Sequence, residues 1–365
     1  MISRRSFVSG LGVVAASPAL AQQALAQQAL AQHAGHDPVY SNLTDANVKT
    51  APLDTMKLQQ AFDSPAPKAA QQGRWVSKAP LPLPRSEMAW ATTLNDRMHV
   101  VGGYGEQRVN RPYHHVYDQA SDKWLDAPFL PRGANHVGVV VANGKLYAIG
   151  GFVEQNRKPD NLCFVLEGEA WRPIAPLPKP FAATGCAAVN GVIYAIGGAV
   201  GDTFATKKSV DWHLSYDPRI DQWAARAPMP TGRDHTGTLA ANGKIHVIGG
   251  RVDSFHTNSN LHHAYDPKAD KWEPRAPLPT ARSGHGAVLY RGKIFVMGGE
   301  GTNRVFGQNE AYDIDKDTWE SYAPMTTPRH GLGAVAIGDF IHVAGGGPVM
   351  GGSFQSAVHE AFTLD

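Results

Sequence analysis

Arginine and histidine side chains recur at similar points along most of this chain, and their types suit the binding of an anion. Arginine presents a planar fork that pairs with a carboxylate through two hydrogen bonds, and histidine can exchange a proton near neutral pH. The candidate ligand-binding residues of these two types are Arg85, Arg132, His136, Arg233, His235, Arg251, Arg282, His285, Arg329 and His330. Five of the arginines (85, 132, 233, 282 and 329), set against the neighbouring Glu87 and Asp234, leave three positive charges in excess.

Two further residues extend this set toward catalysis and stacking. Glu300, together with Arg251 or one of the histidines, could supply an acid and a base, and Trp90 could add an aromatic wall. No nucleophile elbow, phosphate-binding loop or zinc-type His-Glu motif occurs in the sequence. Catalytic residues therefore stay unassigned, and neither a metal ion nor another cofactor is expected.

The elements that must position these residues follow from an internal repeat. Six Gly-Gly pairs end apolar runs at intervals of 47 to 52 residues, at 102–103, 150–151, 197–198, 249–250, 298–299 and 345–346. Six of the eight tryptophans recur with the same period, each 26 or 27 residues before the next Gly-Gly pair. Each unit reads as four short strands, which in the fifth unit are expected at 286–290, 293–297, 309–313 and 319–321.

A double glycine, a Tyr-Asp pair and a later tryptophan in one repeat resemble the kelch motif. The Tyr-Asp pairs stand at 117–118, 216–217, 265–266 and 312–313, whereas the second and sixth units carry Leu-Glu and Phe-Thr. The resemblance covers residues 74–365 and implies an all-β fold, a six-bladed propeller. In propellers the first strand of each blade is innermost, so the arginines and histidines are expected around the mouth of the central channel. The segment around Trp75 and Val76 is expected to complete the sixth blade.

Several of these residues have an alternative structural interpretation. The arginines that begin each unit belong to the repeat, so their side chains could bond backbone carbonyls between blades instead of a ligand. His99, His246 and His342 take a position that other units fill with Tyr147, Tyr194 and Phe295, which indicates packing. Cys163 and Cys186 are both expected to be small buried residues, not partners in a disulfide.

The first 73 residues are expected to lie outside the propeller. Ser3-Arg4-Arg5-Ser6-Phe7 precedes an uncharged stretch with cleavage sites after Ala21, Ala26 or Ala31, which resembles a bacterial twin-arginine signal peptide over residues 1–31. Residues 32–73 are polar and are expected to form a linker or arm. The protein is therefore predicted to be periplasmic or secreted, without a membrane span in its mature form.

Composition limits the choice of partner. The chain of 365 residues carries a formal charge of +2, which argues against a nucleic-acid partner bound by bulk electrostatics. The leading hypothesis is a binding module for an anionic small molecule, glycan or peptide. An alternative is a carbohydrate-active enzyme similar to sialic acid mutarotase (N-acetylneuraminate epimerase), and a third hypothesis is a purely structural propeller that docks other proteins. The oligomeric state is not predicted.

Overall fold

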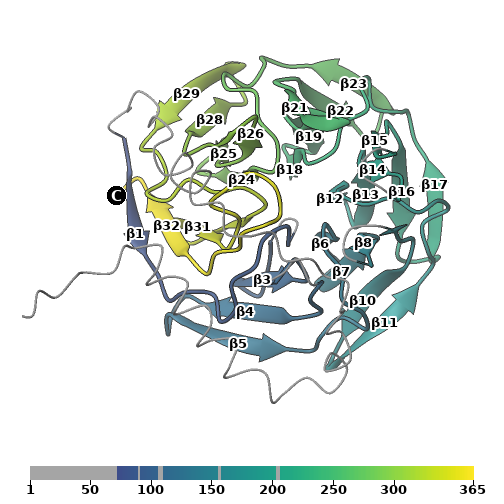
Figure 1. Cartoon of the computed structure of the whole chain (residues 1–365). Coiled ribbons are helices and arrows are strands. Elements are labelled where there is room, and N and C mark those ends of the chain that lie inside the picture. The colour runs from purple at the N-terminus through teal and green to yellow at the C-terminus, as the bar shows by residue number, and fades with distance from the viewer. Residues whose placement is uncertain (1–71, 89–90, 106–109, 155–157, 203–205) are drawn as a thin grey trace, which may run out of the picture.

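A computed structural model describes residues 72–88, 91–105, 110–154, 158–202 and 206–365. Six four-stranded antiparallel sheets stand around a common axis like the blades of a propeller (Figure 1). The described residues contain no α-helix, and no segment among them could cross a membrane as a helix. The predicted all-β, six-bladed propeller is confirmed.

The first three blades follow the chain without a break, from the innermost strand outward. Blade 1 consists of β2 (Thr92–Leu94), β3 (Arg97–Val101), β4 (His114–Asp118) and β5 (Lys123–Ala127). Blade 2 consists of β6 (Gly138–Ala142), β7 (Lys145–Ile149), β10 (Cys163–Glu167) and β11 (Ala170–Ile174). Blade 3 consists of β12 (Gly185–Val189), β13 (Val192–Ile196), β16 (His213–Asp217) and β17 (Gln222–Ala225).

The last three blades repeat this order, and the sixth also takes a strand from the start of the chain. Blade 4 consists of β18 (Gly237–Ala241), β19 (Lys244–Ile248), β22 (His262–Asp266) and β23 (Lys271–Pro274). Blade 5 consists of β24 (Gly286–Tyr290), β25 (Lys293–Met297), β28 (Asn309–Asp313) and β29 (Thr318–Tyr322). Blade 6 consists of β30 (Gly333–Ile337), β31 (Phe340–Ala344), β32 (His359–Thr363) and β1 (Arg74–Ser77).

Four two-stranded ribbons lie between the second and third strands of blades 2 to 5. They are β8 (Phe152–Val153) with β9 (Lys158–Pro159), β14 (Ala199–Val200) with β15 (Lys208–Ser209), β20 (Arg251–Val252) with β21 (Ser254–Asn258), and β26 (Glu300–Gly301) with β27 (Arg304–Val305). These ribbons follow the Gly-Gly pairs directly, at the end of the axis where each blade connects to the next.

The ring closes through β1, as the sequence predicts. Trp75 pairs with Phe362 in the register between β1 and β32, and the indole Nε1 of Trp75 donates a hydrogen bond to the carbonyl of Ala323 in blade 5. Figure 1 shows β1 beside β32 and close to the C-terminus. Closure removes the free edge that an open sheet would expose to aggregation.

The Gly-Gly pairs are required by backbone conformation and by space. Both glycines of every pair have positive φ, for example 70° and 97° at Gly102 and Gly103. A Cβ atom on Gly102 would lie 2.6 Å from the carbonyl oxygen of Ala134 in the next blade. The N–H of Gly103 donates to that same carbonyl, so the pair turns the chain and joins neighbouring blades at once.

Tyrosine, aspartate and tryptophan form a lock between successive blades. In blade 1 the Tyr117 hydroxyl donates to Asp122, Asp122 accepts the N–H of Ala79, and the Trp124 indole donates to the Ala79 carbonyl. The six tryptophans that keep the repeat donate such a bond to a backbone carbonyl at 2.7–2.9 Å. The repeat therefore encodes contacts between blades as well as strands.

The histidines expected to serve packing are buried in pairs. His99 contacts His114, His246 contacts His262 and His342 contacts His359, each through ring nitrogens 2.8–3.0 Å apart. Cys163 and Cys186 are free thiols in one apolar cluster of blades 2 and 3, and Cys163 is buried while Cys186 is half-buried. The signal peptide and almost all of the linker predicted at 32–73 lie outside the described residues.

Candidate functional site

A ring of backbone hydrogen bonds surrounds the propeller axis just before the innermost strands. The N–H of Glu87 donates to Gly331, His136 to Glu87, Ala183 to His136, His235 to Ala183, Gly284 to His235, and Gly331 to Gly284. These six bonds of 2.7–3.4 Å form a closed circle with one residue from each blade. The circle fixes six Cα positions around the axis, from which side chains can converge.

All six residues of this circle have a left-handed backbone. Blades 5 and 6 use glycine there, but Glu87, His136, Ala183 and His235 adopt φ values of 51–55°. This conformation costs an L-residue about 1 kcal/mol or more relative to glycine. Residues held in such a conformation concentrate at functional sites, so the glutamate and the two histidines mark the axis as a candidate site.

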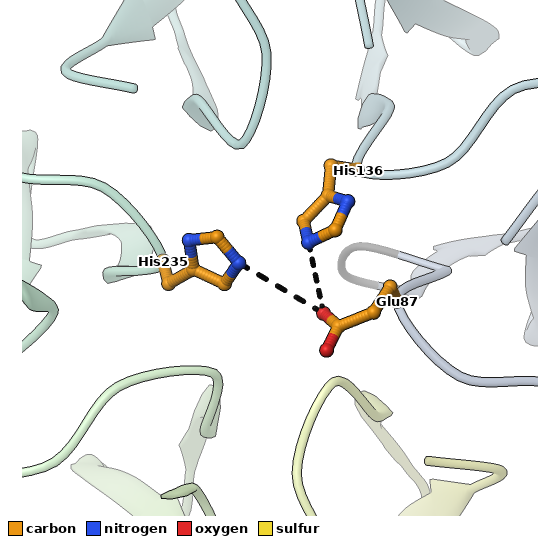
Figure 2. A group of neighbouring side chains, drawn as sticks. All are labelled: Glu87, His136 and His235. Atoms are coloured by element: carbon orange, nitrogen blue, oxygen red, sulfur yellow. Dashed lines mark ion pairs between the residues drawn. The ribbon is translucent and has the colours of Figure 1, made fainter. Parts of the chain in front are cut away.

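Glu87 is the centre of an axial cluster that also contains His136, His235, Glu300 and His330. Figure 2 shows Glu87, His136 and His235 directed toward one another from three different blades. Glu87 Oε2 lies 3.1 Å from His136 Nε2 and 4.0 Å from His235 Nε2. Glu87 Oε1 lies 3.1 Å from His330 Nε2, which is 3.4 Å from Glu300 Oε2. All five residues are buried, with at most 5% of their surface exposed.

A second layer of contacts orients the three imidazoles. The Nδ1 atom of His136 bonds Asn135 Oδ1, that of His235 bonds Asp234 Oδ1, and that of His330 bonds the carbonyl of Gly347 at 2.9 Å. Each of these oxygens accepts a hydrogen bond, so Nδ1 carries a proton in all three rings. The Nε2 atoms are thereby left to face the centre of the cluster.

Arg251 connects the cluster to the ribbon β20–β21. Its guanidinium donates to Asp234 Oδ1 at 2.9 Å, to Glu300 Oε1 at 2.7 Å and to His235 Nε2 at 2.9 Å. Glu300 Oε2 also accepts the N–H of Gly351 at 2.7 Å. The loop from Gly345 to Val358 of blade 6 therefore covers the cluster, since it supplies the partners of both Glu300 and His330.

The charges of the cluster shift the pKa values of its members. Burial would raise the pKa of Glu87, but His136 and His330 lower it well below its usual range. Burial would lower the pKa of His330, yet the Glu300 and Glu87 carboxylates raise it to about 9. Burial lowers the pKa of His136 to about 4, against the opposing effect of Glu87. Protons are thus distributed unequally among histidines that the sequence does not distinguish.

Four of the predicted arginines are fully buried and bonded within the protein. Arg85 and Arg233 donate to the carbonyls of Gly102 and Gly249, each the first glycine of the Gly-Gly pair in its own blade, and each also contacts a histidine ring. Arg282 donates to the carbonyls of Thr280 and Val296, and Arg329 donates to those of Gly345 and Val343. These two arginines also form ion pairs with Glu310 and Glu360. The side chains of these four arginines thus bond backbone carbonyls, which is their alternative structural role. A ligand that used them would have to replace existing bonds.

The remaining predicted residues divide between the axis and other places. In blade 2, Ala134 takes the position that an arginine takes in blades 1, 4, 5 and 6, and Arg132 lies two residues before it. Arg132 donates to Asp160 Oδ2 at 2.5 Å and to the Gly150 carbonyl at 2.9 Å. His285 packs between blades 4 and 5, where its Nε2 accepts the N–H of Gly237 at 3.1 Å. Trp90 lies outside the described residues. His136, His235, Arg251, Glu300 and His330 do converge.

Glu87, Asp234 and Asn135 have larger roles than the sequence suggested. The sequence indicates Glu87 and Asp234 only as charges beside the arginines, and it does not distinguish Asn135. Counting back from the first glycine of each pair by 14 residues, or by 15 in blade 1, reaches the six positions of the hydrogen-bonded circle. That count would have placed Glu87 beside His136 and His235.

Comparisons with known proteins agree with this architecture. The KLHDC2/KLHL20/DRC7 Kelch-repeats domain matches residues 217–347, and the Kelch motif matches residues 134–178 and 180–230. Kelch repeat-containing protein At3g27220 of Arabidopsis thaliana is 26% identical over 210 residues, which cover 54% of this chain and 47% of that protein. Kelch-like protein 24 of Rattus norvegicus is 37% identical over 179 residues, which cover 49% of this chain and 28% of that protein.

The matches to these relatives span less than half of their length. The solved structure of YjhT superposes with a TM-score of 0.66 at 17% identity, covering 77% of this chain and 95% of that one, and this likeness concerns the fold alone. The fold, the backbone hydrogen-bond circle at the axis and the Tyr, Asp and Trp contacts between blades together define a six-bladed β-propeller. The chain belongs to the kelch-repeat proteins.

Proposed function

We propose that this kelch propeller is an exported interaction module that binds an anionic partner on the end of the ring that carries the ribbons, here called the loop face. The observation that supports it is the difference between the two ends of the ring. On the opposite end, the turns within blades contain only two to four residues, such as Asn143-Gly144 and Gly168-Glu169. On the loop face, the connections between second and third strands contain 11 to 16 residues.

The loop face forms a continuous rim across blades 3 to 5. Asp253 of β20–β21 accepts the N–H of Ser209 at 2.8 Å and pairs with Lys208 at 3.1 Å, which joins this ribbon to β14–β15. On its other side, the Asn258 amide donates to the Glu300 carbonyl at 2.6 Å and joins it to β26–β27. A rim ordered before binding loses less conformational entropy when a partner docks.

Accessible cations on this rim support an anionic partner. Lys208 has 66% of its side chain exposed, Arg304 is exposed, and Lys207 lies over the Phe152 ring with its Nζ 4.1 Å from the centroid. Exposed Lys and Arg near a partly apolar surface can pair with a carboxylate without first breaking buried bonds. We assign the contact to these side chains instead of to the buried arginines.

The mutarotase alternative receives less support from the geometry. Its acid and base would be drawn from Glu300, Arg251 or a channel histidine, but Glu300 is 1% exposed and pairs with Arg251 at 2.7 Å. A sugar would have to displace the loop from Gly345 to Val358 to reach this carboxylate. A binding role on the rim needs no such rearrangement.

Calorimetric titration with a panel of acidic glycans, carboxylates and acidic peptides tests the proposed function. We expect an acidic ligand to bind, and the charge reversals Lys208→Glu and Arg304→Glu to weaken binding roughly 10-fold each. Lys123→Glu makes the same charge change on an exposed residue of β5 and should leave affinity unchanged. Binding unaffected by the two rim variants, or no binding by any anion, would refute the proposal.

Export remains part of this proposal, because the twin-arginine-like segment lies outside the described residues. In a bacterial host we expect the mature protein in the periplasm and the Arg4→Lys/Arg5→Lys variant retained in the cytoplasm. Equal distribution of both proteins between the fractions would contradict export by this route.

A further inference from the structure

We propose that the axial cluster binds one divalent transition-metal ion, with His330 Nε2, Glu87 Oε1 and Glu300 Oε2 as its protein ligands. This inference does not rest on the loop-face proposal, because none of the three residues is among the exposed cations assigned to the partner. It also departs from the expectation, drawn from the sequence alone, that the protein binds no metal.

The separations between the three atoms match a shared ion. His330 Nε2 lies 3.1 Å from Glu87 Oε1 and 3.4 Å from Glu300 Oε2, and the three ligand atoms lie within 4.8 Å of one another. Ligands at about 2.0–2.1 Å from a tetrahedral zinc ion are about 3.3 Å apart. The two separations from His330 Nε2 therefore have the required spacing without movement of the backbone.

The geometry around a buried nitrogen also supports the site. The His330 side chain is completely buried, and its Nε2 lies 3.1 Å from Glu87 Oε1 and 3.4 Å from Glu300 Oε2 without forming a hydrogen bond of acceptable geometry to either. Buried polar atoms of this kind require an explanation. The opposite nitrogen, Nδ1, is fixed by the Gly347 carbonyl, which is the arrangement that orients metal-ligating histidines.

The neighbouring carboxylate contacts also suit a cation. His136 Nε2 lies 3.1 Å from Glu87 Oε2, so the second oxygen of this carboxylate is already held in position. The bonds of Glu300 to Arg251 and Gly351 hold the second carboxylate in place.

A second trio of Glu87, His136 and His235 has ligand atoms equally close together, but it lacks a free donor. Arg251 donates a hydrogen bond to His235 Nε2 at 2.9 Å, and this bond occupies the lone pair that a metal would need. The trio with His330 is therefore the site to which we assign the ion.

The donor set indicates the class of ion. One imidazole and two carboxylates suit Zn²⁺ or Mn²⁺, whereas Ca²⁺ and Mg²⁺ prefer oxygen ligands only. Binding replaces the proton on His330 Nε2, which passes to solvent, and the two positive charges of the ion offset the charges of Glu87 and Glu300.

Metal content after refolding tests this site. The full chain, without an affinity tag, is unfolded in urea with a chelator and refolded in excess Zn²⁺ or Mn²⁺. It carries the substitutions His33→Ala and His36→Ala, which remove two neighbouring histidines of the N-terminal segment that could bind metal by themselves. We expect one equivalent of metal to remain after gel filtration. His330→Gln and Glu300→Gln should weaken binding at least about 100-fold.

Controls match these substitutions away from the axis. His99→Tyr places in β3 the residue that β7 and β13 carry at Tyr147 and Tyr194, and Glu273→Gln neutralises an exposed carboxylate; both should bind one equivalent. If the two cluster variants do not fold, X-ray absorption of the zinc-loaded parent should show one imidazole among oxygen ligands near 2.0 Å. No metal in the refolded parent, undiminished metal in the cluster variants, or a spectrum without imidazole overturns the proposal.

Discussion

Single residues in this propeller show which side chains serve the site and which serve the fold. Glu87, His136 and His235 keep a left-handed backbone at positions where Gly284 and Gly331 keep it at no steric cost. Arg85 and Arg233 serve the fold instead, because their guanidinium groups are buried against carbonyls of their own blades. Just before the innermost strands, a charged or imidazole side chain on a left-handed backbone is thus a better marker of the axial site than a recurring arginine.

Histidine pairs between second and third strands make stability depend on pH. In blade 4, His262 Nδ1 donates to the Ala276 carbonyl, so His262 Nε2 accepts from His246 Nδ1 at 2.8 Å and both rings are neutral. Burial lowers the pKa of His246 to about 4 and that of His262 to about 3. The neutral forms therefore stabilise the fold above pH 6.5, and this stability is lost as pH falls toward these values.

We expect the free energy of unfolding to fall below pH 6.5 by up to about 1.4 kcal/mol per pH unit for each such histidine. Urea denaturation between pH 7.5 and 5 measures this slope. The double variant His246→Phe/His262→Asn copies the residues of blade 5, Phe295 and Asn309, and should have a shallower slope. Equal slopes for the parent and the double variant would refute the role of the pair.

Strands and turns are the scale at which the sequence was most informative. The period of the Gly-Gly pairs and tryptophans predicts six blades and the closing strand, because these residues satisfy local demands that recur in each unit. No comparable pattern within one repeat indicates the direction in which a side chain points. Arg85 and Glu87 are two residues apart, yet one is bonded inside its blade and the other faces the axis. Which ring residues meet is decided by contacts between blades that a single repeat does not contain.

The closing strand β1 should be essential to the stability of the ring. Removing Arg74–Ser77 deletes the pairing with β32 and the Trp75 bond to blade 5, and leaves β32 as a free edge. We expect the melting temperature to fall by roughly 10 °C or more, with aggregation on heating. Removing residues 33–71, which precede the described part of the chain, is the matched comparison and should change it little. Equal melting temperatures of the two deletions would contradict closure by β1.

The whole molecule is a disk with two different ends and a filled axis. Short turns at one end leave little surface for a partner, whereas ribbons and long connections at the other end form a hydrogen-bonded rim above the axial cluster. The backbone circle and the buried cluster join all six blades at the centre. We therefore expect the acidic partner to bind across the loop face and not within the axis.

Hydrogen exchange measured by mass spectrometry, with and without the acidic ligand that binds most tightly, tests this account most directly. Binding on the loop face should slow exchange in β14–β15, β20–β21 and β26–β27, and leave the tight turns at 143–144, 190–191 and 242–243 unchanged. Protection confined to those turns, or spread evenly over both ends of the disk, would contradict it.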